Sequence, residues 1–144
     1  MRNLFVRLAL VAAAWLACGC ASPPEPPTNL LAPDSQQAAL RAMQTRTFDV
    51  SDRQQAMRGV IAALQDLGFI IERANEPLGL ITAARFAEPQ YADVVGVTVT
   101  VRPLAEGKME IRANAIYNNV PISDAKVYQN FFATLERSLF AGRN

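Results

Sequence analysis

The clearest pattern along the chain is an alternation of apolar and other residues over 94–102. Val95, Val97, Val99 and Val101 fall on one side of an extended chain, so that side is purely aliphatic. Residues 108–118 alternate in the same way, with one apolar side made of Met109, Ile111, Ala113, Ala115 and Tyr117. Only residues 103–107 separate the two segments. The pattern therefore predicts a β-hairpin with one buried face.

Two other segments have apolar residues at helical spacing. The first follows Ser51-Asp52-Arg53-Gln54, which has the form of a capping box with Ser51 as the cap, and it ends at Gly68. Its stripe consists of Met57, Val60, Ile61, Leu64 and Leu67. The second begins at Ser123 or Asp124 and ends at Gly142, and its stripe consists of Tyr128, Phe131, Phe132, Leu135, Leu139 and Phe140. We expect two amphipathic helices that bury these stripes.

Shorter apolar runs complete the element order. Residues 46–50, 69–73 and 78–86 are typical of strands, with a turn at 75–77, a weak spot at Gly79 and a loop over 87–93. The resulting order is β-α-β-β-β-β-α. It predicts an α+β fold over residues 45–144, a single antiparallel β-sheet with two helices packed on one face. Val99 and Phe132 should meet in its core.

The N-terminus has the order of a secretory signal: a short start with Arg2 and Arg7, an uncharged apolar run over 8–17, and then small residues. The run is too short for a transmembrane helix, which needs about 20 apolar residues. Its end resembles the lipobox of bacterial lipoproteins. This predicts a signal peptide over 1–19 and lipidation of Cys20, which follows Gly19. Cys18 stays open as the runner-up, although bulky Trp15 lies three residues before it.

Residues 20–44 form the expected lipid-anchored linker. Its first part holds five of the nine prolines, which favour an extended and semi-rigid spacer. Residues 35–44 have helical propensity but little apolar face, so we expect a short, poorly anchored helix there. The residue after Cys20 is Ala21, and in enterobacterial lipoproteins an aspartate at that position retains the protein in the inner membrane. The resemblance therefore implies the outer membrane, with the domain facing the periplasm.

Charge and composition narrow the chemistry. The chain has 14 Lys and Arg against 13 Asp and Glu, and loss of Arg2 and Arg7 with the signal leaves about 12 − 13 = −1. This balance gives no electrostatic reason for binding nucleic acid. The chain has no histidine, the commonest general base and metal ligand. We therefore expect a protein that is not an enzyme, with no catalytic residues, no metal and no cofactor.

Several phrases resemble a family of small, largely uncharacterised proteobacterial outer-membrane lipoproteins. They are Arg46-Thr-Phe-Asp-Val50, Leu64-Gln-Asp-Leu-Gly-Phe69, Leu78-Gly-Leu-Ile-Thr-Ala83, Val97-Thr-Val-Thr-Val-Arg-Pro103 and Tyr128-Gln-Asn-Phe-Phe-Ala-Thr-Leu-Glu-Arg-Ser-Leu-Phe140. The order of elements also resembles the helix-grip domains of BamC, a lipoprotein of the outer-membrane β-barrel assembly machine. The resemblance implies an envelope lipoprotein and carries over no site residues.

The side of the sheet opposite the helices supplies the candidate site. It should present Glu72, Thr98, Thr100, Arg102, Glu110, Arg112 and Asn114. We expect Arg102, Arg112 and Asn114 to contact an envelope protein, although ion pairs with Glu110 and Glu72 explain the arginines equally well. The first hypothesis is thus a non-catalytic lipoprotein that acts as a protein-binding accessory or assembly factor. The alternative is a binder of a small apolar ligand or lipid, with a cavity under the second helix.

Overall fold

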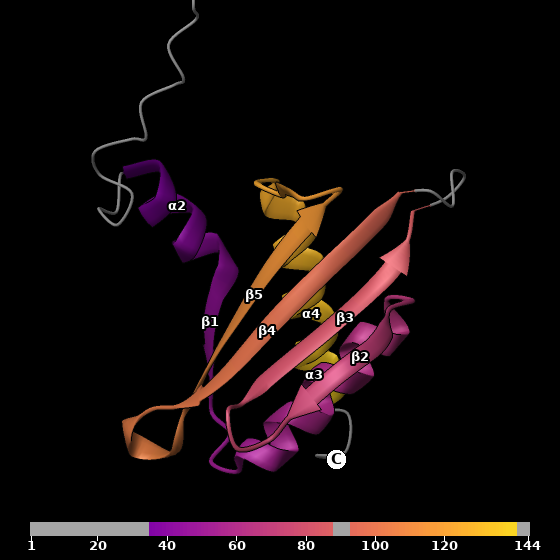
Figure 1. Ribbon diagram of the computed structural model, residues 1–144. Coiled ribbons are helices and arrows are strands. Elements are labelled where there is room, and N and C mark those ends of the chain that lie inside the picture. Colours follow the sequence, from indigo (N-terminus) through magenta and orange to yellow (C-terminus); the bar gives the residue numbers. More distant parts are fainter. Residues whose placement is uncertain (1–34, 88–92, 141–144) are drawn as a thin grey trace, which may run out of the picture. The chain divides into compact units, whose positions relative to one another are not determined.

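The computed structural model describes residues 35–87 and 93–140, which all belong to one compact unit. Its order of elements is that of an α+β protein with one antiparallel sheet, which confirms the predicted fold class (Figure 1). The predicted signal peptide, Cys18, Cys20, the linker prolines and Gly142 lie outside the described residues.

Six strands form the sheet. They are β1 (Thr45–Phe48), β2 (Ile70–Asn75), β3 (Leu80–Phe86), β4 (Val94–Pro103), β5 (Met109–Tyr117) and β6 (Val120–Pro121). The order across the sheet is β1-β5-β4-β3-β2, and β6 also pairs with β5. Since β4 occupies one edge of β5, β1 and β6 share the other edge: β1 pairs with Met109–Arg112 and β6 with Ile116 and Tyr117.

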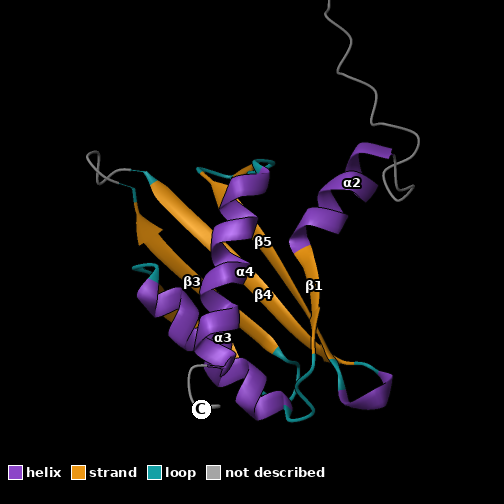
Figure 2. Cartoon of the chain, turned by 180° about the vertical axis from the view of Figure 1, so that it is seen from behind, coloured by secondary structure: helices purple, strands orange, loops and turns teal. Residues whose placement is uncertain are grey.

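Helices α3 (Arg53–Asp66) and α4 (Ala125–Phe140) cover the same face of the sheet (Figure 2). The predicted aliphatic row lies beneath them, with Val97, Val99 and Val101 buried. Both predicted helical stripes are buried or partly buried. Val99 and Phe132 are completely buried in this core. The alternation could predict this because one face of the sheet meets helices and the other does not.

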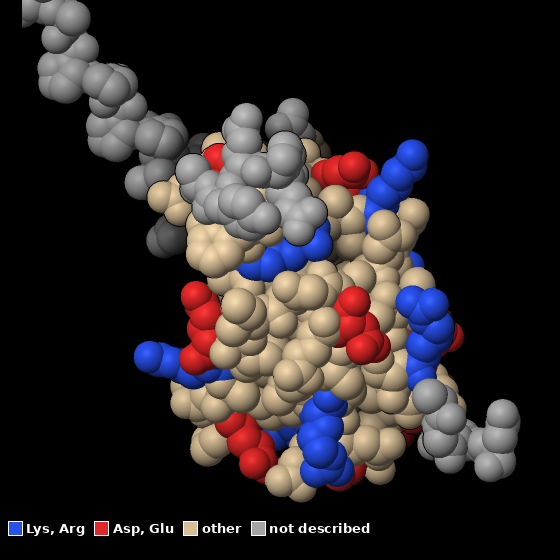
Figure 3. All heavy atoms as spheres, turned by 90° about the vertical axis from the view of Figure 1, so that its right-hand side faces the viewer, with Lys and Arg blue, Asp and Glu red and all other residues tan. Residues whose placement is uncertain are grey.

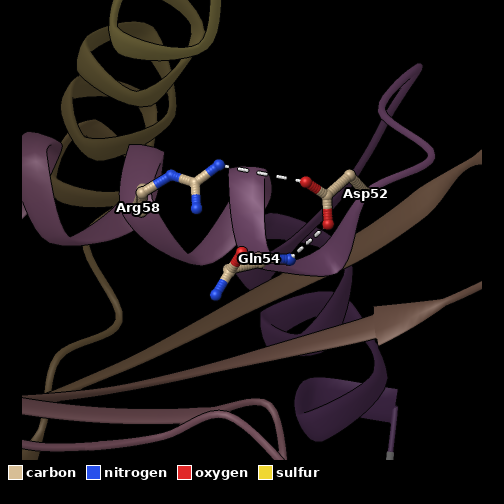
Figure 4. A network of polar contacts seen from close by, with 3 residues as sticks. All are labelled: Asp52, Gln54 and Arg58. Carbon is tan, nitrogen blue, oxygen red and sulfur yellow. Dashed lines mark hydrogen bonds and ion pairs between the residues drawn. The ribbon is translucent and has the colours of Figure 1, made fainter.

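The caps of both helices lie at aspartates. Asp52, not Ser51, is the N-cap of α3: its backbone is extended, and its carboxylate accepts a hydrogen bond of 2.9 Å from the Gln54 N–H (Figure 4). Arg58 lies 3.9 Å from the same carboxylate. In α4, Asp124 accepts from the Lys126 N–H at 2.9 Å. A carboxylate also suits the positive end of the helix dipole, which explains why each aspartate caps in place of the serine before it.

The end of α3 confirms the prediction for Gly68. The Gly68 N–H donates to Gln65 O at 2.9 Å, and the Phe69 N–H donates to Leu64 O at 2.9 Å. These two bonds form a Schellman motif, which needs a left-handed residue at this position. Gly68 supplies it with a φ of 80°. The chain then enters β2.

A further helix, α2 (Ser35–Gln44), leads into β1. It is anchored at its C-terminal end, contrary to our expectation. Gln44 is only 5% exposed, and its side-chain amide donates to Tyr128 Oη at 3.1 Å and Asn114 Oδ1 at 3.2 Å. The side chains of Leu40 and Met43 pack against the core. No helix among the described residues is long and apolar enough to cross a membrane.

Helices α3 and α4 touch closely at one point. A Cβ on Gly59 would lie 2.4 Å from Leu139 Cδ2, so a larger residue at this position would require the Leu139 side chain to move. Away from this crossing the helices diverge toward the C-terminal end of α3 and the N-terminal end of α4 (Figure 2). The divergence determines where the sheet is less tightly covered.

Candidate functional site

A cavity of about 230 Å³ lies where the two helices diverge over the sheet. We call it the α3–α4 cavity. It is lined by Leu64, Leu67, Phe69, Arg85, Val95, Val97, Ala113, Ala115, Ile122, Val127, Tyr128, Asn130 and Phe131. These residues come from both helices, from β3, β4 and β5, and from the segments after α3 and β6.

Small side chains on the floor of the sheet produce the hollow. Ala113 and Ala115 are buried neighbours on the helix-covered side of β5, and Val97 of β4 pairs with Ala115. Tyr128 and Phe131 form the wall contributed by α4, and both are buried. Because the alanine methyl groups are short, the diverging helices leave space above them that larger residues would fill.

Arg85 is the one charged residue of the lining. Its Nη1 donates to Leu67 O at 3.2 Å, and its guanidinium carbon lies 5.1 Å from the centre of the Phe69 ring. Leu67 and Phe69 themselves line the cavity. Their contacts therefore fix the guanidinium at the cavity's edge, where Arg85 is exposed to solvent.

Two polar side chains of α4, Tyr128 and Asn130, line the cavity, and they differ in whether they can still form a hydrogen bond with a ligand. The Tyr128 hydroxyl donates to Ile122 O at 2.6 Å and accepts from Gln44, so both of its roles are satisfied within the protein. Asn130 is exposed. The cavity is thus an apolar space with one polar edge, the usual composition of a small-molecule site. Its volume is below the roughly 300–1,000 Å³ of sites for drug-sized ligands, which favours a narrow chain.

A cluster of polar side chains ties the loop after β3 to the turn after β5. The Asp93 carboxylate accepts hydrogen bonds from Tyr117 Oη and, at 2.8 Å, from Asn118 Nδ2. The bond from Tyr117, and secondarily the one from Asn118, lowers the pKa of Asp93. The same bond to Asp93 raises the pKa of Tyr117. Asn118 and Asn119 both have positive φ, as a type I′ hairpin requires, and the turn leads into β6.

The three predicted contact residues share the side of the sheet that α3 and α4 leave uncovered, which we call the open face. The register places Arg102 opposite Glu110, Arg112 opposite Thr100, and Asn114 opposite Thr98. Arg102 lies 3.9 Å from Glu110, and Asn114 accepts the bond from Gln44. Arg112 has no ion-pair partner among the residues that the structure describes. Glu72 is exposed at an irregularity in β2, and no described residue forms an ion pair with it.

The opposite end of the open face is apolar, which sequence reasoning missed. One row in register crosses five strands; it consists of Ile70, Ala84, Gly96, Ile116 and Pro121. We call it the apolar row. Phe86 and Val94 form the next pair along the same face. Ile70 is 68% exposed and Phe86 59%. Ile116 interrupts the polar side of its strand in the sequence, and this was the available signal.

Arg85 was also missed, although the sequence contains a sign of it. Ile81, Ala83 and Arg85 alternate along β3, so the arginine ends a row that is otherwise buried. A charge on the covered side of a strand indicates a polar edge or a site. The cavity itself could not be foreseen, because it depends on how the helices diverge above the alanines.

Metal and charge features are sparse. No group of three or more potential metal ligands occurs within the described ranges. On the side of the molecule seen in Figure 3, basic and acidic residues are interspersed among uncharged ones, without a large area of one sign (Figure 3).

Comparisons with known proteins add little. No family model matches the chain, and no curated protein matches it. Among solved structures, the chain is similar to the adenylate sensor from AMP-activated protein kinase in complex with the ribofuranotide ZMP. The TM-score is 0.48 at 11% sequence identity, over 67% of this chain and 95% of the other.

Proposed function

We propose that this chain is a non-catalytic lipoprotein, lipid-anchored at the outer membrane and facing the periplasm, whose domain binds a small apolar ligand. The proposal of ligand binding rests on the α3–α4 cavity of about 230 Å³ with its aliphatic and aromatic lining. Filling an apolar space of this kind with an apolar group removes apolar surface from water, which is favourable. The anchor and the location rest on the N-terminal sequence alone.

The binding proposal is testable with 1-octanol, a neutral single-chain probe. The protein is the whole chain from residue 20 onward with Cys20→Ser, so that no acyl group of its own competes. Titration should shift the NMR amide signals of Val97, Ala113 and Ala115 in a saturable way. Ala115→Leu fills the floor and should weaken binding at least about tenfold.

The matched control is Ala62→Leu, which adds the same atoms on the exposed side of α3. It should bind octanol like the unchanged protein. Absence of saturable shifts in the unchanged protein contradicts the proposal. Full binding by a folded Ala115→Leu variant contradicts it equally, because the probe would then sit elsewhere.

Protein binding as an accessory or assembly factor is the second candidate, and the apolar row favours it. Exposed apolar residues that are contiguous on one face are typical of interaction sites. The partner would be an envelope protein with an apolar surface and a carboxylate placed to meet Arg112 on the same face. Arg102 and Asn114 contribute less than the sequence suggested, since both have partners within the domain.

Two exposed apolar residues make a matched pair for testing this candidate. Ile70 on the apolar row is 68% exposed, and Leu78 in the turn between β2 and β3 is 69% exposed. Crosslinked partners should be lost with Ile70→Ser or Arg112→Glu and kept with Leu78→Ser. If the Ile70→Ser and Arg112→Glu variants keep the same crosslinked partners, the open face does not bind protein and is only a solvated surface.

A further inference from the structure

The edge of the α3–α4 cavity specifies the ligand further, and this step rests on the proposed function. We propose that the cavity takes a single alkyl chain with an anionic headgroup, the chain lying over Ala113 and Ala115 and the headgroup on Arg85. A carboxylate and a phosphate share the chemistry that recognises such a ligand.

Charge at the edge of the cavity is positive and is not balanced by an acidic residue of the lining. The lining contains Arg85 and no acidic residue. Among the residues that the structure describes, no carboxylate forms an ion pair with Arg85. A guanidinium has five N–H donors, and Leu67 O is the one described acceptor of Arg85. Donors therefore remain for a ligand, in the planar arrangement that suits carboxylate or phosphate oxygens.

The guanidinium of Arg85 is held in place before any ligand arrives. Leu67 O and the Phe69 ring fix Arg85 from two sides, and both residues also line the cavity. Less side-chain freedom is then lost on binding, which strengthens the contact.

Arg85 also has a structural role at the C-terminal end of α3. Leu67 is the C-cap of α3, and a cation at a helix C-terminus is stabilising in itself. The helix end, however, carries only about half a negative charge, so it offsets part of the charge of Arg85. The remaining positive charge has no acidic partner among the described residues, while the rest of the lining, Asn130 apart, consists of apolar and aromatic side chains.

Binding constants for octanol, octanoate and octyl phosphate separate the inference from the function on which it rests. All three carry the same chain, and they are measured on the same Cys20→Ser chain by the NMR titration above. We expect at least one anion to bind about tenfold or more tightly than octanol, a difference of about 1.4 kcal/mol. The tighter anion identifies the headgroup as carboxylate or phosphate.

Variants of Arg85 decide whether that preference comes from its charge. Arg85→Gln should lose the preference for the anion, because its affinities for octanol and for the anions should become equal, and Arg85→Lys should restore part of the preference. Arg73→Gln, on the neighbouring strand β2 and exposed, is the matched control and should keep the full preference.

Equal affinity for octanol and both anions in the unchanged protein overturns the inference and leaves the proposed function standing. A preference that survives in Arg85→Gln also overturns it. If none of the three probes binds, the proposed function fails and the inference fails with it.

Discussion

Phe132 is the residue on which the core depends most directly. It is completely buried, and its ring centre lies 5.1 Å from that of Phe131 and 6.3 Å from that of Phe48. Phe132→Ala should lower the free energy of unfolding by about 3–5 kcal/mol through lost burial and a new cavity. A domain of this size has about 5–15 kcal/mol in total. Denaturant titration measures the change.

Phe86→Ala is the control for that measurement, because Phe86 is 59% exposed on the open face. Its effect should stay within about 0.5 kcal/mol, as for other surface substitutions. An unchanged denaturation midpoint for Phe132→Ala would show that the Phe132 ring does not stabilise the core.

Asp93 and Tyr117 make the loop contact dependent on pH. Because the pKa of Asp93 is lowered, the ionised carboxylate stabilises the folded domain. This stabilisation is fully present above the ordinary pKa of about 3.9 and is lost as the pH falls through the folded-state pKa. Because the pKa of Tyr117 is raised, the protonated hydroxyl stabilises the folded domain. This stabilisation is fully present below a pH of about 10 and is lost as the pH rises through the folded-state pKa. Tyr117→Phe should therefore raise the pKa of Asp93.

Carbon NMR of the Asp93 carboxyl group follows this titration directly. Tyr128→Phe removes a hydroxyl whose bonds go to Gln44 and Ile122, so it should leave the titration of Asp93 unchanged. An Asp93 titration that is identical in Tyr117→Phe would mean that the Tyr117 hydroxyl does not donate to this carboxylate in solution.

Among the strands, the close contact between the start of β3 and the neighbouring strand β4 depends on Gly79, which lies just before β3. A Cβ on Gly79 would lie 2.2 Å from Val101 O, and the Val101 N–H donates to Gly79 O at 2.7 Å. Its φ of 62° adds left-handed strain for any other residue. Gly79→Ala should therefore destabilise the domain by clearly more than the about 1–2 kcal/mol of that strain alone.

Gly68→Ala is the control that measures the strain of the left-handed backbone without a steric clash. Gly68 also has a left-handed φ, of 80°, but nothing lies within 4 Å of the position of its Cβ. Thermal or denaturant unfolding of both variants should show a small loss for Gly68→Ala and a larger one for Gly79→Ala. Equal losses would mean that the backbone around Gly79 moves aside at little cost.

The sequence predicts best the elements whose burial repeats along the chain. The valines of β4 and the stripe of α4 repeat over several turns or pleats, so each residue supports the same assignment. The cap of α3 was wrong by one residue, since Ser51 and Asp52 are both good caps and the pattern alone does not separate them. The strand β6 was missed because it has two residues, although Asn118-Asn119 suits a type I′ turn.

The candidate sites depend on features that no short pattern contains. The open face and its polar residues followed from alternation in β4 and β5. The apolar row needs the register of five strands at once, and the α3–α4 cavity needs the helix crossing at Gly59 as well as the alanines beneath. The position of Arg85 could have been read from β3, but its contacts with Leu67 and Phe69 could not.

The proposed lipid anchor concerns the chain as a whole. We predict that Cys20 is the acylated residue, because Gly19 precedes it and Trp15 is unfavourable three residues before Cys18. Cys20→Ser should abolish labelling with a fatty acid and leave uncleaved precursor in the cells. If Cys18→Ser alone has this effect, the assignment to Cys20 is wrong.

Gln44 also determines how the domain would respond to mechanical force. Tension applied to α2 would reach the sheet through Gln44 and then through β1, which is joined to β5 over four residue pairs. This short edge should yield before the longer ladder between β4 and β5. Because Phe48 and Arg46 of β1 lie against the Phe132 ring, its detachment would open the core at that edge. The domain would then lose strength first at the β1 edge of the sheet.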